Sequence, residues 1–461
     1  MNVKKPVFLT VGGDLQRMET NGTVSERGDD ASIQTENPDI TFLSSIREKL
    51  ETVPPLSSTC SIHKVPKMLR SVNDKAYNPK VISIGPFHRG EESLQVMEEH
   101  KWRYLRIFLD WYPQIKLEDY VEVLKGLEES ARQCYVEPIK LGSYEFVEMM
   151  LLDGFFILVL FLKMWTREWD SRDPIFRTRW MLGPIMLDML LLENQIPFFV
   201  LERLFQLSEV PNQDDERHPT LLELTYVFFS KFLKRDEILD QTISRSEVKH
   251  LLDFVRSFLL PSSIMVLPQG DRRYDFTPTA TELHHAGALF KVVKSNCLLD
   301  INFRNGVLEI PFLKFEDWTE LFFRNLIAWE QCQTLLNCEI TSYASLMDGL
   351  IKTPEDVDLL IQYGIIENRL GDNKDVSRLF NNSVKEVSLD NDKFYFSSVC
   401  RDLNEYCKMR HHRWKASLKR DYFNTPWALI NFMGAIVVQL SLTSIQTVCA
   451  LISVKNTNTN G

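Results

Sequence analysis

Apolar positions along most of the chain recur every three to four residues, the spacing of one face of an α-helix. Order is expected to begin near Thr41 with a short amphipathic helix over 41–53, followed by a proline-rich entry segment at 55–90. This pattern predicts a mainly α fold, with one large helical domain. Further helices are expected at 92–112, 117–133, 143–167, 180–195, 197–207, 220–234, 246–259, 282–290, 316–336, 340–352, 355–363, 374–388 and 396–419.

Two short stretches carry a β pattern instead. The apolar run KVISIG, residues 80–85, is a candidate strand, and LLDINFRNGVLEIP, residues 298–311, predicts a hairpin. Asn305-Gly306 is the preferred two-residue turn because both of its positions need positive φ. KVVKS, residues 291–295, is a candidate third strand. The turn sets the facing pairs, which are Phe303 with Leu308 and Ile301 with Ile310 on one side and Asn302 with Glu309 on the other.

The segment 143–167 is strongly apolar but is interrupted by charged residues. Its longest uncharged run, Gly154 to Leu162, makes about 14 Å of helix, against roughly 30 Å of bilayer hydrocarbon. A helix of this kind cannot span a membrane. Because it is apolar on most sides, it is expected in the protein core.

The segment from Tyr422 to Val454 contains no charged residue. A helix over 427–454 is about 42 Å long, enough to cross a bilayer with some tilt. Pro426 suits the first helical turn, where its missing N–H costs nothing. Trp427, with Tyr422 and Phe423, stands where an interfacial aromatic belt is found. The segment is therefore predicted to be a transmembrane anchor.

Basic residues precede this anchor, and only Lys455 follows it. The juxtamembrane basic residues are Arg410, Arg413, Lys415, Lys419 and Arg420. The positive-inside rule then places the bulk of the chain in the cytosol, with residues 455–461 as a short polar tail on the other side. The N-terminus lacks the long apolar run of a signal peptide, which fits insertion after synthesis. The basic stretch is also expected to contact anionic lipid.

One face of the predicted anchor is polar. Gln439, Thr443, Gln446 and Thr447 follow the i, i+4, i+7, i+8 spacing of a single helix face. This face suggests hydrogen bonding to a second transmembrane helix, and hence a possible homo-oligomer. The alternative is a buried core helix, which needs cover on every side.

Charge and cysteine usage narrow the function classes. The net charge is −10, while residues 401–420 carry a local +5, so the rest of the chain sums to about −15. An acidic body argues against nucleic-acid binding, which requires a basic face. The eight cysteines form no CxxC pair and are expected to be reduced and mostly buried.

No established catalytic motif occurs, including GxSxG, GxxxxGK[ST], GxGxxG and HExxH. Cys407 and His411, with Cys400 and His412 nearby, have a spacing that could hold a metal, but a packed thiol on a basic helix is favoured. His88 and the pair His284-His285 are interpreted as exposed turn residues. The carboxylates Asp153, Asp188, Glu193 and Glu202 lie in apolar helices, where hydrogen bonding to neighbouring elements is favoured over acid–base catalysis. No cofactor or metal site is predicted.

Seven runs together resemble the plant family known as domain of unknown function 247, over about residues 45–450. They are VPKMLRSVNDKAYNPKVISIGPFHRG, MEEHKWRYL, LLDGFFIL, LLLENQIPFFVLERLF, FRNLIAWEQC, MDGLIKTPEDVDLLIQYGIIENRLG and YFNTPWAL. The resemblance implies a largely helical plant protein that usually ends in one transmembrane helix. Some members are genetically tied to self-incompatibility or sex determination, which implies recognition or signalling. The family brings no established activity and no catalytic residues.

The expected organisation is a disordered leader (1–40), a helical domain (41–421), a transmembrane helix (422–454) and the polar tail. We expect a non-enzymatic, single-pass membrane protein that recognises an unknown protein partner, in the plasma membrane or an endomembrane. The alternative is a membrane-tethered enzyme with a novel site near His88 or the carboxylates at 188–202.

Overall fold

The computed structural model describes residues 38–52, 60–169, 171–208, 219–233, 248–261, 276–295, 297–333, 338–390, 393–409 and 426–458. The chain divides into two units, Met1–Leu56 and Ser57–Gly461. The first contains α1 (Pro38–Thr52), which confirms the expected short helix. Among its described side chains Phe42, Leu43 and Leu50 are exposed.

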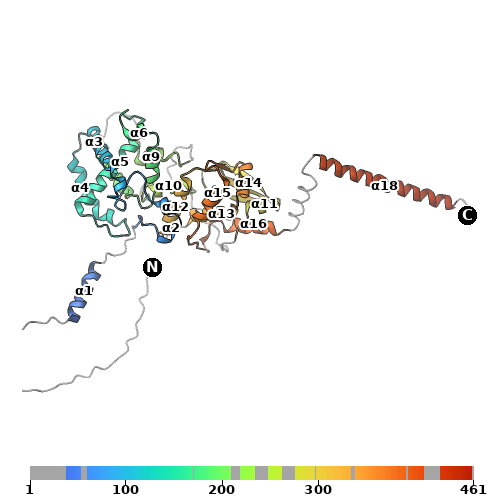
Figure 1. The fold of residues 1–461 in the computed structure, drawn as a ribbon, viewed down its shortest axis with the longest axis horizontal. Helices are drawn as coiled ribbons and strands as arrows, with labels where there is room; N and C mark the ends of the chain where they lie inside the picture. Colours follow the sequence, from blue (N-terminus) through green and yellow to red (C-terminus); the bar gives the residue numbers. More distant parts are fainter. Residues whose placement is uncertain are drawn as a thin grey trace, which may run out of the picture. The chain divides into compact units, whose positions relative to one another are not determined.

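In the second unit a group of helices surrounds α5, which contacts α3, α4, α8 and α9 (Figure 1). The side chains of α5 are almost all buried from Phe146 to Phe161, so this apolar helix lies in the core as predicted. The elements up to this point are α2 (Lys67–Val72), η1 (Asp74–Tyr77), η2 (Glu92–Leu94), α3 (Val96–Trp111), α4 (Leu117–Arg132), α5 (Ser143–Thr166), α6 (Pro174–Arg177), α7 (Leu182–Asp188), α8 (Phe198–Ser208), α9 (Leu221–Phe229) and α10 (Leu251–Leu259).

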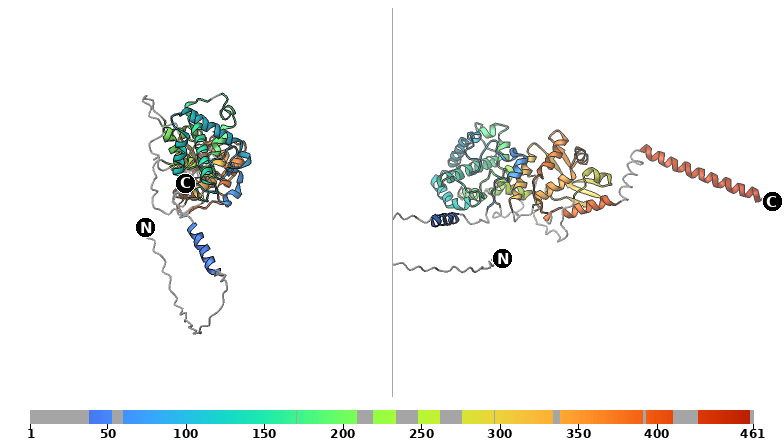
Figure 2. Two further views of the ribbon diagram at one scale, coloured as in Figure 1. Left: turned by 90° about the vertical axis from the view of Figure 1, so that its left-hand side faces the viewer. Right: turned by 60° about the horizontal axis from the view of Figure 1, so that its bottom comes forward.

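The following helices form a second group that shares the same hydrophobic core. Within it α12 packs on α13 and α15, and α14 packs on α11 and α15. Figure 2 shows this group in yellow and orange beside the blue and green helices around α5. These helices are α11 (Ala280–His285), α12 (Thr319–Gln331), α13 (Glu339–Leu350), α14 (Pro354–Gln362), α15 (Asn373–Ser383) and α16 (Ser397–Lys408), and α18 (Pro426–Asn458) comes after them in the chain. The mainly α fold class is confirmed.

The predicted hairpin is present as β2 (Asn302–Arg304) and β3 (Val307–Pro311). Asn305 and Gly306 have φ of 52° and 76°, as the turn requires. Phe303 faces Leu308 and Asn302 faces Glu309, as expected. Ile301 precedes β2 and is outside the ladder, although it is buried, as is Ile310. The third strand, β1 (Leu289–Val293), pairs with β3 in parallel. A second pair, β4 (Leu313–Phe315) with β5 (Ile366–Asn368), was not predicted.

The predicted strand over 80–85 is wrong. The backbone N–H groups of Lys80, Val81 and Ile82 do not meet a neighbouring strand but donate to the carboxylate of Asp188, at 2.7–3.1 Å. The N–H of Ile84 donates to Asn194 Oδ1 at 2.6 Å. Side chains therefore satisfy this extended backbone, as buried N–H groups require.

The predicted helix over 180–195 stops early, since α7 ends at Asp188. After it, side-chain amides bind the carbonyl groups that a longer helix would use: Asn194 Nδ2 donates to Asp188 O, and Gln195 Nε2 donates to Met189 O and Leu191 O. Competition of this kind ends helices.

The helix expected over 282–290 is also partly wrong. Helix α11 ends at His285, and Gly287, with φ of 93°, turns the backbone into β1. Leu289 N then donates to Gly306 O of the hairpin turn. Leu289 and Phe290, which the local pattern assigned to the helix, therefore belong to strand β1 and pair with β3.

Side chains of α12 hold the entry segment from far along the chain. Trp329 Nε1 donates to Ser61 O at 3.2 Å, and Asn325 Nδ2 donates to Ala76 O at 2.9 Å. Asn73 Nδ2 donates to Glu320 Oε1 at 2.9 Å. The entry segment is thus fixed by contacts across the core in addition to its own short helices, α2 and η1.

Candidate functional site

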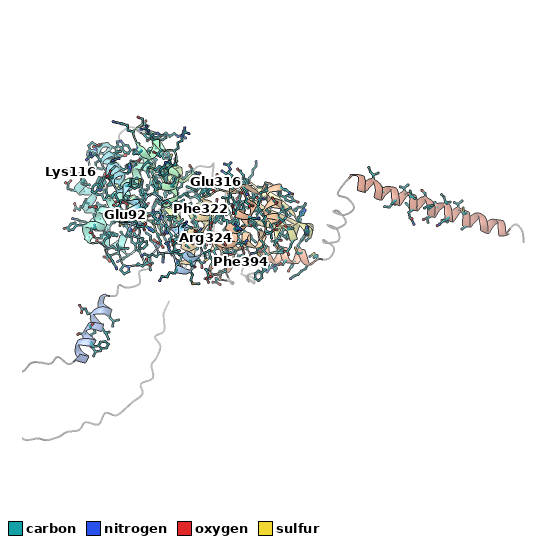
Figure 3. The ribbon with its side chains drawn as sticks, in the orientation of Figure 1. Glu92, Lys116, Glu316, Phe322, Arg324 and Phe394 are labelled. Carbon is teal, nitrogen blue, oxygen red and sulfur yellow. The ribbon has the colours of Figure 1, made fainter. Side chains whose placement is uncertain are left out.

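Helix α18 contains the one candidate membrane span found in the described part of the chain, Met433–Ala450. None of these eighteen residues is buried, and their side chains project on all sides of the helix (Figure 3). At 1.5 Å per residue the span is about 27 Å long, close to the thickness of bilayer hydrocarbon. Length and composition therefore fit a membrane-spanning helix.

Gln439, Thr443, Gln446 and Thr447 all lie in α18, so their i, i+4, i+7, i+8 spacing places them on one side of this helix. Thr443 Oγ1 donates to Gln439 O at 2.8 Å, and Thr447 Oγ1 donates to Thr443 O at 2.6 Å. The hydroxyl groups are thus satisfied by their own helix. Within the described residues, the side-chain amides of Gln439 and Gln446 have no hydrogen bond. In hydrocarbon such amides favour a partner helix.

Pro426 is the first residue of α18, the position that a missing N–H favours. Trp427 follows it in the helix, but its side chain lies outside the described residues. The basic residues expected before the anchor also lie outside them, in 410–425: these are Arg410, Arg413, Lys415, Lys419 and Arg420.

His88 is buried, so its interpretation as an exposed turn residue is wrong. Its Nδ1 lies 2.6 Å from Glu91 Oε1, and its Nε2 lies 3.6 Å from Glu193 Oε2. Glu193 Oε1 accepts a hydrogen bond from Val65 N at 2.5 Å and pairs with Arg70 at 2.8 Å. The turn packs inward because Gly85, at φ 76°, brings the backbone against Gln195 O, which leaves no room for a Cβ atom.

Two other carboxylates singled out from the sequence, Asp153 and Asp188, bind backbone N–H groups and do not line an open site. Asp153 is fully buried, pairs with Lys101 at 2.6 Å and accepts a hydrogen bond from Gly85 N. Burial raises the pKa of Asp153, while Lys101 acts to lower it. Burial also raises the pKa of Asp188 to about 6, against the lowering effect of the three N–H groups it accepts. The prediction that these carboxylates hydrogen-bond neighbouring elements is confirmed for both.

The candidate metal site is only partly described, because two of its possible ligands, His411 and His412, lie outside the described residues. Cys407 is half-buried on α16, and the Sγ of buried Cys400 lies 3.0 Å from Thr277 Oγ1. Among the described residues no group of three or more ligands is placed to hold a metal. His284 and His285 are exposed, as expected.

All eight cysteines are free thiols, as predicted. Their burial differs from the expectation, since only Cys134 and Cys400 are fully buried and Cys449 is exposed on α18. The remaining thiols are half-buried because they lie at the ends of helices or in loops, where packing covers one side.

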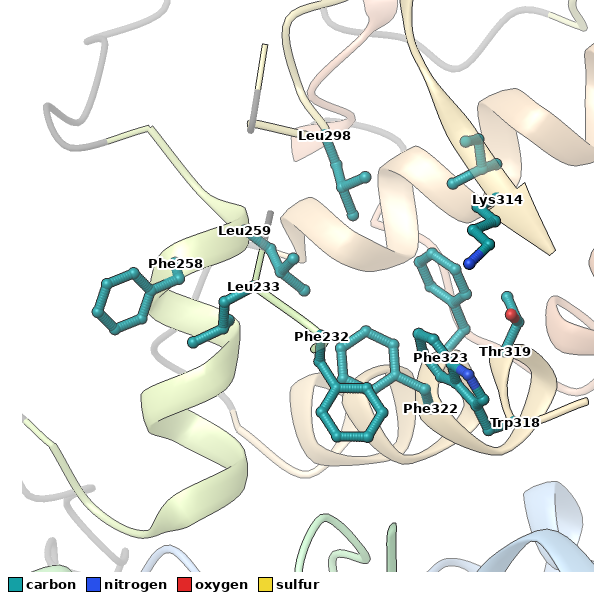
Figure 4. A pocket seen from close by; sticks show the side chains of 11 residues that line it. Phe232, Leu233, Phe258, Leu259, Leu298, Lys314, Trp318, Thr319, Phe322 and Phe323 are labelled. Carbon is teal, nitrogen blue, oxygen red and sulfur yellow. The ribbon is translucent and has the colours of Figure 1, made fainter. Parts of the chain in front are cut away.

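An apolar pocket of about 60 Å³ lies between α10, β4, α12 and the residues after α9 (Figure 4). Phe232 and Phe322 stack at 6.1 Å between ring centroids, and Trp318 meets Phe232 edge-on at 4.7 Å. Neither His88 nor the carboxylates Glu193 and Glu202 line it. Its residues come from separate stretches of the chain, so no local pattern marked it. They are Phe232, Leu233, Phe258, Leu259, Leu298, Leu313, Lys314, Trp318, Thr319, Phe322 and Phe323.

A second feature missed from the sequence is a surface rich in tryptophan and arginine between α5 and α7. Trp165, Trp169 and Trp180 are exposed by 41%, 45% and 63%, respectively, which is unusual for so apolar a side chain. Four arginines occur in the same stretch, at 167, 172, 177 and 179. The local composition of MWTREWDSRDPIFRTRW was the available signal.

Comparison with known proteins gives the family. The family model described as "Plant protein of unknown function", domain of unknown function 247, matches residues 62–441. The UPF0481 protein At3g47200 of Arabidopsis thaliana is 34% identical over 423 residues, covering 86% of this chain and 87% of the relative. A second Arabidopsis UPF0481 protein, At3g02645, is 24% identical over 484 residues, covering 84% and 89%. No solved structure matches the chain. The chain belongs to the plant family of domain of unknown function 247.

Proposed function

We propose that this protein is a single-pass membrane protein, held in the bilayer by α18, whose helical body recognises other proteins. The observation that carries the proposal is the exposed, uncharged span Met433–Ala450. Helix α5 is the natural comparison, because it is also strongly apolar yet is buried by its neighbours. An apolar helix without such cover favours lipid as its surroundings.

The basic residues before α18 support a cytosolic body, by the positive-inside rule. The polar face with Gln439 and Gln446 supports a second copy of the chain as a partner within the membrane. The pocket beside Phe232 and Phe322 has room for one apolar side chain of a protein partner.

Protein recognition is favoured over catalysis because the buried carboxylates are occupied by hydrogen bonds within the protein. Asp153, Asp188 and Glu193 each bind backbone N–H groups within the protein. The approach of His88 to Glu193 is the observation that favours the alternative, a membrane-tethered enzyme. Burial of both side chains weighs against substrate access.

Alkaline washing of vesicles tests the anchor. The full chain is expected to stay with the lipid, whereas a chain stopped at Asp421 is released. Leu442→Arg, in the middle of the span, should also weaken retention, because a central arginine costs about 3 kcal/mol. Release of the intact full chain would refute the membrane proposal. Capture of proteins by the anchored full chain then addresses the partner.

A further inference from the structure

We infer that the segment from Trp165 to Trp180 is a membrane-contacting surface that lays the folded body against an anionic lipid interface. This inference rests on the proposed anchoring by α18 and names a second lipid contact in the same chain. The segment joins α5 to α7 and contains the short helix α6 (Figure 1).

The segment is a fixed surface rather than a loose loop. Asp173 accepts hydrogen bonds from Tyr104 of α3 at 2.9–3.0 Å and pairs with Lys163 of α5. Asp173 also accepts a hydrogen bond from Ile175 N at 3.0 Å, which caps α6, and Ile175 is fully buried. The middle of the segment is thereby held on α3 and α5, while Trp165, Arg167, Trp169, Arg177, Arg179 and Trp180 are exposed.

One of the exposed aromatic side chains is held in place by a ring contact. Trp169 stacks on Phe176, with ring centroids 4.9 Å apart and planes 11° apart. Every exposed tryptophan in the described part of the chain lies between residues 102 and 180, and three lie in this segment. Tryptophan prefers the membrane–water interface, where the ring is shielded and the N–H stays wet.

Three of the four arginines in the segment lack the glutamate partners that arginines elsewhere in the body have within the described residues. Within the described residues Arg167, Arg177 and Arg179 form no ion pair, whereas Arg70, Arg132 and Arg256 each pair with glutamate. The neighbouring acidic residues are Glu168 and Asp170, since Asp173 is taken by Lys163. Two positive charges therefore remain in excess, on a chain of net charge −10. Guanidinium groups are suited to phosphate because they bind it in a bidentate manner.

Because α18 already holds the chain at the membrane, even a weak lipid contact is enough to orient the folded body on the bilayer. Residues 410–425 between α16 and α18 reach about 55 Å at full extension, so an anchored body always remains close to the bilayer. A tethered surface meets its target at a high effective concentration. A soluble protein partner would gain no such advantage, which is why lipid is favoured.

The test uses the full chain inserted into vesicles of phosphatidylcholine with brominated acyl chains, with or without phosphatidylserine. Brominated lipid quenches tryptophans at the level of the acyl chains. Replacing Trp165, Trp169 and Trp180 together with phenylalanine should reduce the quenched emission to about half or less, because only tryptophans near α18 remain in contact with lipid. Trp102→Phe is the matched control, since Trp102 is exposed by 50% on the side of α3 facing away from Tyr104.

The arginine variant Arg167→Gln, Arg177→Gln, Arg179→Gln should lose the extra quenching that phosphatidylserine brings, while keeping the quenching seen in phosphatidylcholine. Equal quenching of the wild type and the triple tryptophan variant would overturn the inference. A loss of quenching in Trp102→Phe as large as that in the triple variant would also overturn it. Equal quenching together with loss of a captured protein would assign the segment to a protein partner instead. Alkaline washing of the same vesicles tests α18 separately, so failure of the lipid contact is distinguishable from failure of the anchor.

Discussion

Lys101 and Asp153 form an ion pair in the centre of the helical body, with Nζ 2.6 Å from Oδ1 and both side chains fully buried. Lys101 also donates to Ser83 O, and Asp153 accepts from Gly85 N. The pair thus holds the non-helical stretch 83–85 between α3 and α5. Its role in the structure is to satisfy backbone where no sheet or helix does so.

Breaking this pair should be costly. Lys101→Met leaves a buried carboxylate without its cation, so the free energy of unfolding should fall by about 3–5 kcal/mol. Denaturant unfolding of the full chain in mild detergent measures the change. The double variant Lys101→Met, Asp153→Leu should recover part of the loss. Removing the exposed Arg378 of the Arg378–Asp375 pair is the control and should cost about 0.5 kcal/mol or less. Equal losses at the two pairs would contradict the role assigned to Lys101.

Asp188→Asn tests whether the carboxylate takes the place of a neighbouring strand. The amide keeps one acceptor oxygen but points an NH₂ group at backbone donors, so we expect a loss of about 2–4 kcal/mol. Amide hydrogen exchange should quicken at Lys80, Val81 and Ile82. Asp375→Asn, on an exposed helix start, serves as the comparison. Unchanged exchange over 80–82 would show that other contacts hold this stretch.

The stability of the folded body should depend on pH through His250. Burial, with a smaller effect of Lys249, lowers the pKa of His250 to about 3 from the ordinary 6.5. As pH falls from 6.5 toward 3, the unfolded chain binds a proton that the folded chain does not. The free energy of unfolding should therefore fall by about 1.4 kcal/mol per pH unit from this residue.

His250→Asn isolates this contribution. His250 Nδ1 accepts a hydrogen bond from Asp253 N at the start of α10, and asparagine can cap the helix in the same way. Between about pH 7.5 and about pH 5, the wild type should lose roughly 2 kcal/mol more than the variant. The exposed His285→Asn is the control. Parallel pH profiles for wild type and His250→Asn would exclude the effect.

The polar face of α18 is tested by crosslinking in membranes. Gln439→Leu with Gln446→Leu removes two side-chain amides, each worth about 0.5–2 kcal/mol between helices, so the crosslinked dimer should disappear. Ser441→Leu is the matched control, because Ser441 lies on the opposite side of the helix and donates to Val437 O. A dimer that survives the double substitution, or is lost in the control, would count against pairing through this face.

The sequence pattern correctly predicted those elements whose structure depends on contacts between neighbouring residues. The long helices α3, α4 and α5 and the Asn305-Gly306 turn follow from periodicity and positive φ, which neighbouring residues determine. The failures at 80–85 and at His88 share one cause. In both, the deciding partner lies far along the chain: Asp188 for the N–H groups of 80–82, and Glu193 for His88. The early end of α7 has a local cause, because the amides of Asn194 and Gln195 bind carbonyl groups four to six residues before them.

The candidate sites also divide into those that the local sequence marked and those that form only when distant segments meet. Lack of charge marked α18, and interruption by Asp153 and Lys163 correctly excluded α5 as a span. The pocket beside Phe322 could not be foreseen, because it exists only when α10, β4 and α12 meet. The Trp165–Trp180 surface had a local signal, but the hydrogen bond from Tyr104 that holds Asp173 in its middle joins residues 69 positions apart.

The bonds from Trp329 to Ser61 and from Asn325 to Ala76 join residues 268 and 249 positions apart. A ribosome releases Ser61 long before it makes Trp329, so the stretch around Ser61 must wait for most of the polypeptide before its partners exist. Contacts so distant along the chain slow folding and prolong the exposure of unpaired backbone. We therefore expect nascent chains that end before α12 to depend on chaperones, and to become resistant to protease only after residue 329 has emerged.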